Sequence, residues 1–158
     1  MAGIEPEPSK RVMADGGDLI ARIREIFSVY PRPEHFTKFE HCEECAEHDT
    51  TLARHTPDSI SLNELGNPGW DPICFATPPA FLYYFPALAR LSLGRGEDHY
   101  LDLFLFHLND DRLDLLSPPE RAVVRELLQH LWEVFAGDPA VLDMDVEQFE
   151  RCFRCLDK

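Results

Sequence analysis

Cysteine, histidine and carboxylate side chains are concentrated in one short stretch, HCEECAEHDTTLARH, which runs from His41 to His55. Two of the five cysteines and three of the seven histidines lie in it. Thiolate, imidazole and carboxylate groups are common ligands of transition metals, and the spacing Cys42-x2-Cys45-x2-His48 is typical of a close ligand set. The stretch therefore predicts a metal site, with zinc as the common ion that best suits sulfur together with imidazole.

Helix geometry limits which of these residues can share one ion. In a continuous helix, His55 would lie about 15 Å along the axis from Cys45, because each residue rises by about 1.5 Å. Bonds from zinc to its ligands are only about 2.0–2.3 Å long. We therefore expect a tight turn over Cys42 and Cys45, followed by a helix that presents His48, so that two thiolates and one imidazole converge.

The sequence leaves the fourth coordination position open. The candidates are water or one of the nearby side chains His41, His55, His35 and Glu44. A water molecule in that position is what a catalytic zinc needs, whereas a fourth protein ligand makes the site structural.

Two metal-free interpretations of the stretch also stay open. One is an amphipathic helix whose histidines and glutamates face water while Cys45 and Leu52 contact the core. The other is a redox-active Cys-x2-Cys pair. Glu43 and Glu44 lie between the two thiols and count against this pair, because neighbouring negative charge disfavours a thiolate.

The other three cysteines are expected to be structural. Cys152 and Cys155 flank the apolar stripe of the last helix, where a free cysteine behaves as a small hydrophobe. A site that they share with Cys42 and Cys45 is the alternative. Cys74 is expected in the core.

The elements that position these residues are predicted to be helices, from apolar residues at three- and four-residue spacing and from capping residues. We expect a mainly α, single-domain helical bundle with at most one minor short strand pair, in which residues 1–17 form a flexible lead and residues 18–158 form the domain. The expected helices start at or near Asp18, Ser61, Thr77, Tyr100, Ser117 and Asp145.

The run GNPGWDP, from Gly66 to Pro72, is typical of an irregular loop because it holds two glycines and two prolines. Gly66 is expected to end the short helix before it in a left-handed conformation, and Trp70 to pin the loop to the core. Residues 73–76 are expected to be extended. His107 is expected to be a hydrogen-bonded core histidine.

Charge and composition exclude several classes of function. Fifteen basic against twenty-nine acidic residues give a net charge of −14, which would repel a nucleic-acid backbone. A basic protein partner, a cation or simple solubility accounts for that charge. There is no run of the roughly eighteen apolar residues that a membrane-spanning helix needs. The N-terminal residues have no apolar signal core, which predicts a cytoplasmic location with reduced cysteines.

No motif assigns a reaction, because the chain has no G-x-S-x-G, no glycine-rich phosphate loop and no H-E-x-x-H. The main alternative to a metal-binding protein is a metal-free, acidic interaction module of the inhibitor or immunity type. A metal-dependent hydrolase is a third class, and it would need a cleft at the open coordination position.

The segments HCEECAEHDTTL, ELGNPGWDPICF and TPPAFLYYFPAL together resemble small uncharacterised bacterial proteins of a domain-of-unknown-function family. The similarity covers roughly His41 to Leu93, with a weaker likeness in YLDLFLFHL. That family has no assigned reaction, so the resemblance implies a bacterial, cytoplasmic setting and no catalytic residue.

Overall fold

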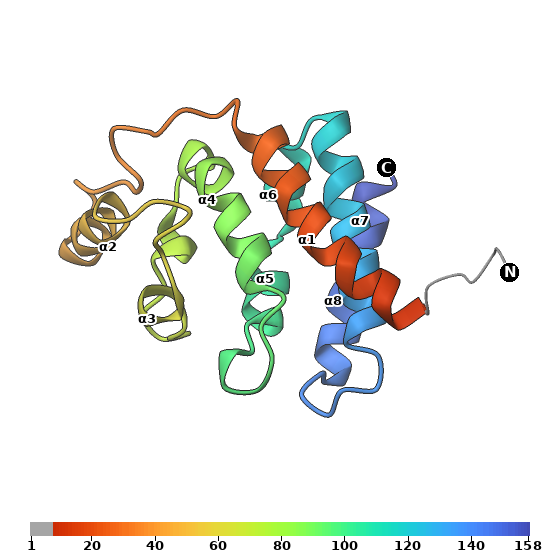
Figure 1. Cartoon of the computed structure of the whole chain (residues 1–158). Coiled ribbons are helices and arrows are strands. Elements are labelled where there is room, and N and C mark those ends of the chain that lie inside the picture. The colour runs from red at the N-terminus through yellow and green to blue at the C-terminus, as the bar shows by residue number, and fades with distance from the viewer. Residues whose placement is uncertain (1–7) are drawn as a thin grey trace, which may run out of the picture.

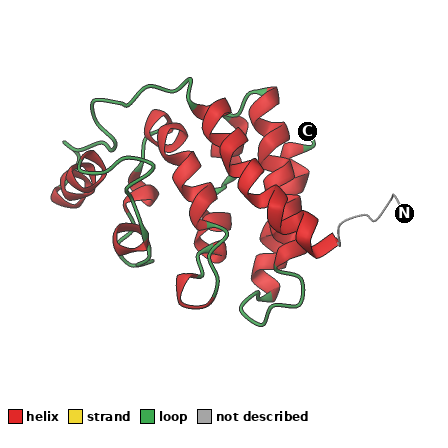
Figure 2. Cartoon of the chain, in the orientation of Figure 1, coloured by secondary structure: helices red, strands yellow, loops and turns green. Residues whose placement is uncertain are grey.

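The computed structural model describes residues 8–158, with side chains from residue 16 onward. Within this part of the chain the regular structure is helical, apart from one isolated antiparallel bridge between Thr37 and Ala76 (Figure 2). The predicted mainly α fold is confirmed, and the predicted strand pair amounts to this bridge. The elements are α1 (Pro8–Phe27), α2 (Glu43–Ala53), α3 (Leu62–Leu65), the 3-10 helix η1 (Pro72–Phe75), α4 (Pro78–Leu91), the 3-10 helix η2 (Gly96–Asp98), α5 (Leu101–His107), α6 (Asp110–Asp114), α7 (Pro118–Val134) and α8 (Asp143–Leu156).

The helices form two unequal groups (Figure 1). In the larger group α1 packs against α4 and α7, and α8 packs against α5, α6 and α7. In the smaller group α2 and α3 both pack on η1, at the end of the molecule away from α7 and α8. The Cys/His stretch therefore belongs to the smaller group.

Helix α4 lies between the two groups and contacts both of them. Most of its side chains are buried. Phe85 stacks on Phe27 of α1 with ring centroids 4.6 Å apart. On the other side, the hydroxyl of Tyr84 donates to the carbonyl oxygens of Leu52 at 2.5 Å and His55 at 2.8 Å, at the C-terminal end of α2. Burial of one such large side chain contributes about 1.5–3 kcal/mol. The hydrogen bonds from buried Tyr84 therefore hold the C-terminal end of α2 against the core.

Three helix starts predicted from capping residues are confirmed. The carboxylate of Glu64 accepts the N–H of Ser61 at 2.9 Å, and that of Glu120 accepts the N–H of Ser117 at 3.0 Å. The hydroxyl of Thr77 accepts a backbone N–H from the first turn of α4 at 3.4 Å. Such caps contribute about 1 kcal/mol each. The helices predicted near Tyr100 and Asp145 are also present, as α5 and α8.

The predicted start of the first helix is wrong, because α1 begins at Pro8 and already contains Asp18. The sequence signal is misleading there, since Gly16 and Gly17 each disfavour a helix by about 1 kcal/mol. Packing overrides that preference: a Cβ on Gly16 would lie 3.0 Å from Nε2 of His130 on α7, so glycine lets the two helices approach. Of the predicted flexible lead, residues 1–7 lie outside the described residues, and residues 8–17 have a helical backbone.

Two predictions of local structure around the loop are also wrong. Gly66 ends α3 with φ −80° rather than in the left-handed region. Glycine fits there because a Cβ would lie 2.6 Å from the carbonyl oxygen of Leu62. Residues 73–76 are mostly helical rather than extended, because Asp71 caps η1 and accepts the N–H of Ile73 at 3.0 Å.

Candidate metal centre

The two cysteines of the Cys-x2-Cys motif lie at the N-terminus of α2. Cys42 is the N-cap residue, with an extended backbone at φ −164° and ψ 171°. Its Sγ accepts a hydrogen bond from the N–H of Cys45 at 3.3 Å. The sulfur therefore occupies the position that a serine or aspartate oxygen takes at most helix starts.

Three potential ligands converge at this helix end: His41, Cys42 and Cys45. The two Sγ atoms are 3.3 Å apart, and Sγ of Cys45 is 3.7 Å from Nδ1 of His41. A turn holds His41 in place, since its N–H donates to the carbonyl oxygen of Lys38 at 2.8 Å. His41 and Cys42 are exposed, whereas Cys45 is buried, so the group is open to solvent on one side.

The surroundings of the two thiols separate their pKa values. The hydrogen bond from the N–H of Cys45, together with the nearby His41 and the Cys45 thiol, lowers the pKa of Cys42 to about 7. The hydrogen bond between the two sulfurs, together with burial, raises the pKa of Cys45. The exposed sulfur is thus the readier of the two to become a thiolate. The expectation that Glu43 and Glu44 disfavour a thiolate is wrong for Cys42, because the N–H of Cys45 and His41 lower its pKa.

His48, the expected third ligand, lies outside this group. Its fully buried ring packs between Trp70 and Phe75, with centroids 4.5 Å and 4.8 Å away. Nε2 lies 3.5 Å from a carboxylate oxygen of Glu44, but without hydrogen-bond geometry, so neither ring nitrogen has a hydrogen-bond partner. Trp70 does not pin its loop to the core as predicted: it is 42% exposed and covers His48. The ligand group therefore has His41 in the place expected for His48.

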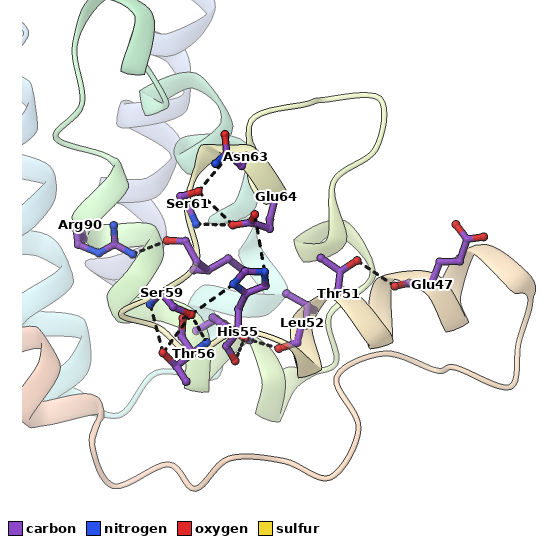
Figure 3. Close-up of polar contacts among 12 residues, drawn as sticks. Glu47, Thr51, Leu52, His55, Thr56, Ser59, Ser61, Asn63, Glu64 and Arg90 are labelled. Carbon is purple, nitrogen blue, oxygen red and sulfur yellow. Dashed lines mark hydrogen bonds and ion pairs between the residues drawn. The ribbon is translucent and has the colours of Figure 1, made fainter.

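The other two histidines considered for the fourth position already have polar partners. Nδ1 of His35 lies 2.9 Å from the carboxylate of Asp49. His55 faces Ser59, at 3.4 Å, and the carboxylate of Glu64, at 3.8 Å (Figure 3). These contacts hold the two rings in place, and neither histidine belongs to the ligand group at Cys42.

Asp49 is the residue that ties the preceding loop to α2. Burial alone would raise the pKa of its carboxyl group, but hydrogen bonds from His35 and from the N–H groups of Phe36 and Thr37 bring the pKa below its ordinary value. The hydroxyl of Thr37 also donates to the carbonyl oxygen of Cys45 at 2.6 Å. The loop and the helix start that carry the ligands are thus held to each other.

A second group, Asp71, Cys74 and His107, also brings potential metal ligands together. Asp71 and His107 are buried, and Nε2 of His107 is 2.6 Å from the carboxylate of Asp71. This confirms the expectation of a buried, hydrogen-bonded His107. The prediction that Cys74 lies in the core is wrong, because η1 replaces the expected extended segment and leaves Cys74 exposed.

Arg112 makes this second group a poor metal site. Its guanidinium donates to the carbonyl oxygens of His107 at 3.1 Å and Ile73 at 2.6 Å, and it lies over the ring of Phe81. It is also 3.4 Å from Nδ1 of His107. A metal ion at Nε2 would move the ring proton to Nδ1, where it would face another N–H donor. The ion would also be repelled by the fixed guanidinium, by several kcal/mol at short distance. We therefore assign this group a structural role.

The last two cysteines take no part in either group. Cys152 and Cys155 are buried in α8, as predicted. The Sγ of Cys152 is 3.7 Å from the carbonyl oxygen of Leu108, and that of Cys155 is 3.8 Å from the carboxylate of Asp114. Helix α8 lies across the molecule from α2 (Figure 1), so the structure does not bring the two cysteine pairs together.

Comparison of the chain with protein-family models, curated proteins and solved structures found no match. The resemblance to uncharacterised bacterial proteins therefore stays a prediction. None of the described helices has the length and apolar character needed to cross a membrane. The chemistry of the convergent His41, Cys42 and Cys45 group is accordingly the basis for assigning a function.

Proposed function

We propose that this protein binds one zinc ion through Nδ1 of His41 and the Sγ atoms of Cys42 and Cys45. The observation that carries the proposal is the convergence of these three atoms at one helix end. Two thiolates and an imidazole form a ligand set that zinc uses in many proteins.

The spacing of the three atoms suits a tetrahedral ion. With bonds of about 2.3 Å to sulfur and about 2.0 Å to nitrogen, tetrahedral zinc separates two sulfurs by about 3.8 Å, and a sulfur from a nitrogen by about 3.5 Å. The distances here are 3.3 Å between the sulfurs and 3.7 Å from sulfur to nitrogen. Zinc would therefore have to move the two sulfurs apart by only about 0.5 Å.

The fourth coordination position would face solvent, since His41 and Cys42 are exposed. Water or a donor atom from a partner molecule would complete the tetrahedron. An open position is what allows a zinc ion to exchange, to bind a substrate or to polarise water. We therefore propose an accessible zinc site rather than a closed structural one.

Metal analysis of the tag-free protein, purified under reducing conditions and given one equivalent of zinc before extensive dialysis, tests the proposal. We expect close to one zinc per chain. A content below about a tenth of an equivalent would reject the proposed site, because a folded site of this kind retains its metal at neutral pH. Calcium or magnesium in place of zinc would also reject it, since these ions prefer oxygen ligands.

The affinity for zinc should fall steeply as the pH falls. Zinc binds the thiolates, so protons on the two sulfurs compete with the metal. The pKa of Cys42 is about 7 and that of Cys45 is raised, so binding displaces one thiol proton above about pH 7 and two below it. Competition titrations against a chelator of known affinity should show a loss of about tenfold per pH unit above that point and about a hundredfold just below it. An affinity independent of pH would contradict thiolate ligation.

Binding of a basic protein is the second candidate function. The observation that favours it is the net charge of −14. Electrostatic association of this kind weakens steeply as the salt concentration rises. A partner that is captured equally well at low and high ionic strength would contradict it.

A further inference from the structure

The two sulfur ligands of the proposed zinc site lie close enough to react with each other. Their Sγ atoms are 3.3 Å apart, against about 2.0 Å in a disulfide. On the basis of the proposed zinc site, we propose that it is a redox switch: a peroxide oxidises Cys42 and Cys45 to a disulfide, and the zinc ion is released.

Exposure assigns a different role to each sulfur. Cys42 is exposed and Cys45 is buried, so a peroxide from solvent meets Cys42 first. Its sulfur attacks one peroxide oxygen: an S–O bond forms, the O–O bond breaks and hydroxide leaves, which makes Cys42 a sulfenic acid. The sulfur of Cys45 then attacks that of Cys42. The S–S bond forms, the S–O bond breaks and a second hydroxide leaves, so the two sulfurs together pass two electrons to the peroxide.

Zinc is released because the ligands change chemically. Thiolates bind zinc strongly, but a disulfide carries no negative charge and is a poor ligand. After oxidation only Nδ1 of His41 is left of the three protein donors. One ring nitrogen does not retain zinc against a chelator.

The position of the pair at a helix end favours its reaction over the other i, i+3 pair in the chain. Cys42 has an extended backbone outside α2, which leaves its sulfur free to turn toward that of Cys45. Cys152 and Cys155 both lie within α8 and are buried. Their sulfurs contact the carbonyl oxygen of Leu108 and the carboxylate of Asp114. Peroxide should therefore act selectively at the metal site.

Hydrogen peroxide added to the zinc-loaded protein tests the switch. Zinc is measured before the oxidant is added and then followed with a chromogenic chelator, while peptide mass spectrometry locates any disulfide. We expect nearly all the zinc to be released together with a Cys42–Cys45 disulfide, and a thiol reductant to restore binding. Cys74→Ser is the matched control, because it removes the other exposed cysteine and should leave the release unchanged.

The outcomes separate the two proposals. Reduced protein that holds no zinc before oxidation overturns the zinc site itself. Protein that holds zinc and keeps it after oxidation overturns only the switch. Zinc loss without the Cys42–Cys45 disulfide, or a slower loss in Cys74→Ser, also overturns the switch, because the metal would then leave by another route.

Discussion

Replacement of Asp71 by asparagine is expected to destabilise the protein by about 2–3 kcal/mol, the cost of leaving a buried donor without its charged acceptor. Both carboxylate oxygens of Asp71 are acceptors: one takes the N–H of Ile73 and the other faces Nε2 of His107. An asparagine amide must turn its NH₂ group toward one of these two donors. The substitution also removes the negative charge of Asp71 that favours the guanidinium of Arg112, which lies at the other side of the imidazole.

The choice of asparagine separates the capping of η1 from the hydrogen bond between Asp71 and His107. Asparagine caps a helix about as well as aspartate, so a role for Asp71 in capping η1 alone predicts a nearly neutral change. Chemical denaturation followed by far-UV circular dichroism measures the free energy of unfolding. Asp58→Asn is the control, because Asp58 forms an exposed ion pair with Arg24 and should change stability by less than about 1 kcal/mol. Similar losses in the two variants would contradict a buried network.

The sequence predicts most helices in this fold because their signals are local. A capping residue followed by an apolar stripe locates α4 and α7, and neither depends on residues far along the chain. The start of α1 could not be predicted in this way, because it depends on packing. Gly16 disfavours a helix locally, but it lies where α1 closely approaches His130, more than a hundred residues later.

The contrast between local signals and tertiary packing also explains which parts of the candidate site could be predicted. The approach of Cys42 and Cys45 is predictable, since residues three apart at a helix start are neighbours. The choice between His41 and His48 is not predictable from spacing. The ring of His48 packs against Trp70 and Phe75 instead. These two residues contact it because η1 packs on α2. The spacing therefore identifies two of the three proposed ligands, whereas the choice of histidine depends on tertiary contacts.

Replacement of Cys42 by serine should lower the affinity for zinc by at least about a hundredfold, because a neutral hydroxyl replaces one of only two thiolate ligands. Serine is a good N-cap residue, and its oxygen can accept the N–H of Cys45 that the sulfur accepts now. The metal-free variant should therefore keep its helix content and its free energy of unfolding. Isothermal titration with zinc, together with denaturation of the metal-free protein, measures both quantities.

Two histidine variants decide which ring binds the metal. His41→Ala should lose zinc affinity by about tenfold or more, since it removes a ligand. His48→Phe should bind zinc as the natural chain does. It should also be at least as stable, because phenylalanine can fill the slot between Trp70 and Phe75 without burying two ring nitrogens that lack hydrogen-bond partners. If His48→Phe loses zinc and His41→Ala retains it, the ligand set is Cys42, Cys45 and His48, and the N-terminal end of α2 must rearrange when the metal binds.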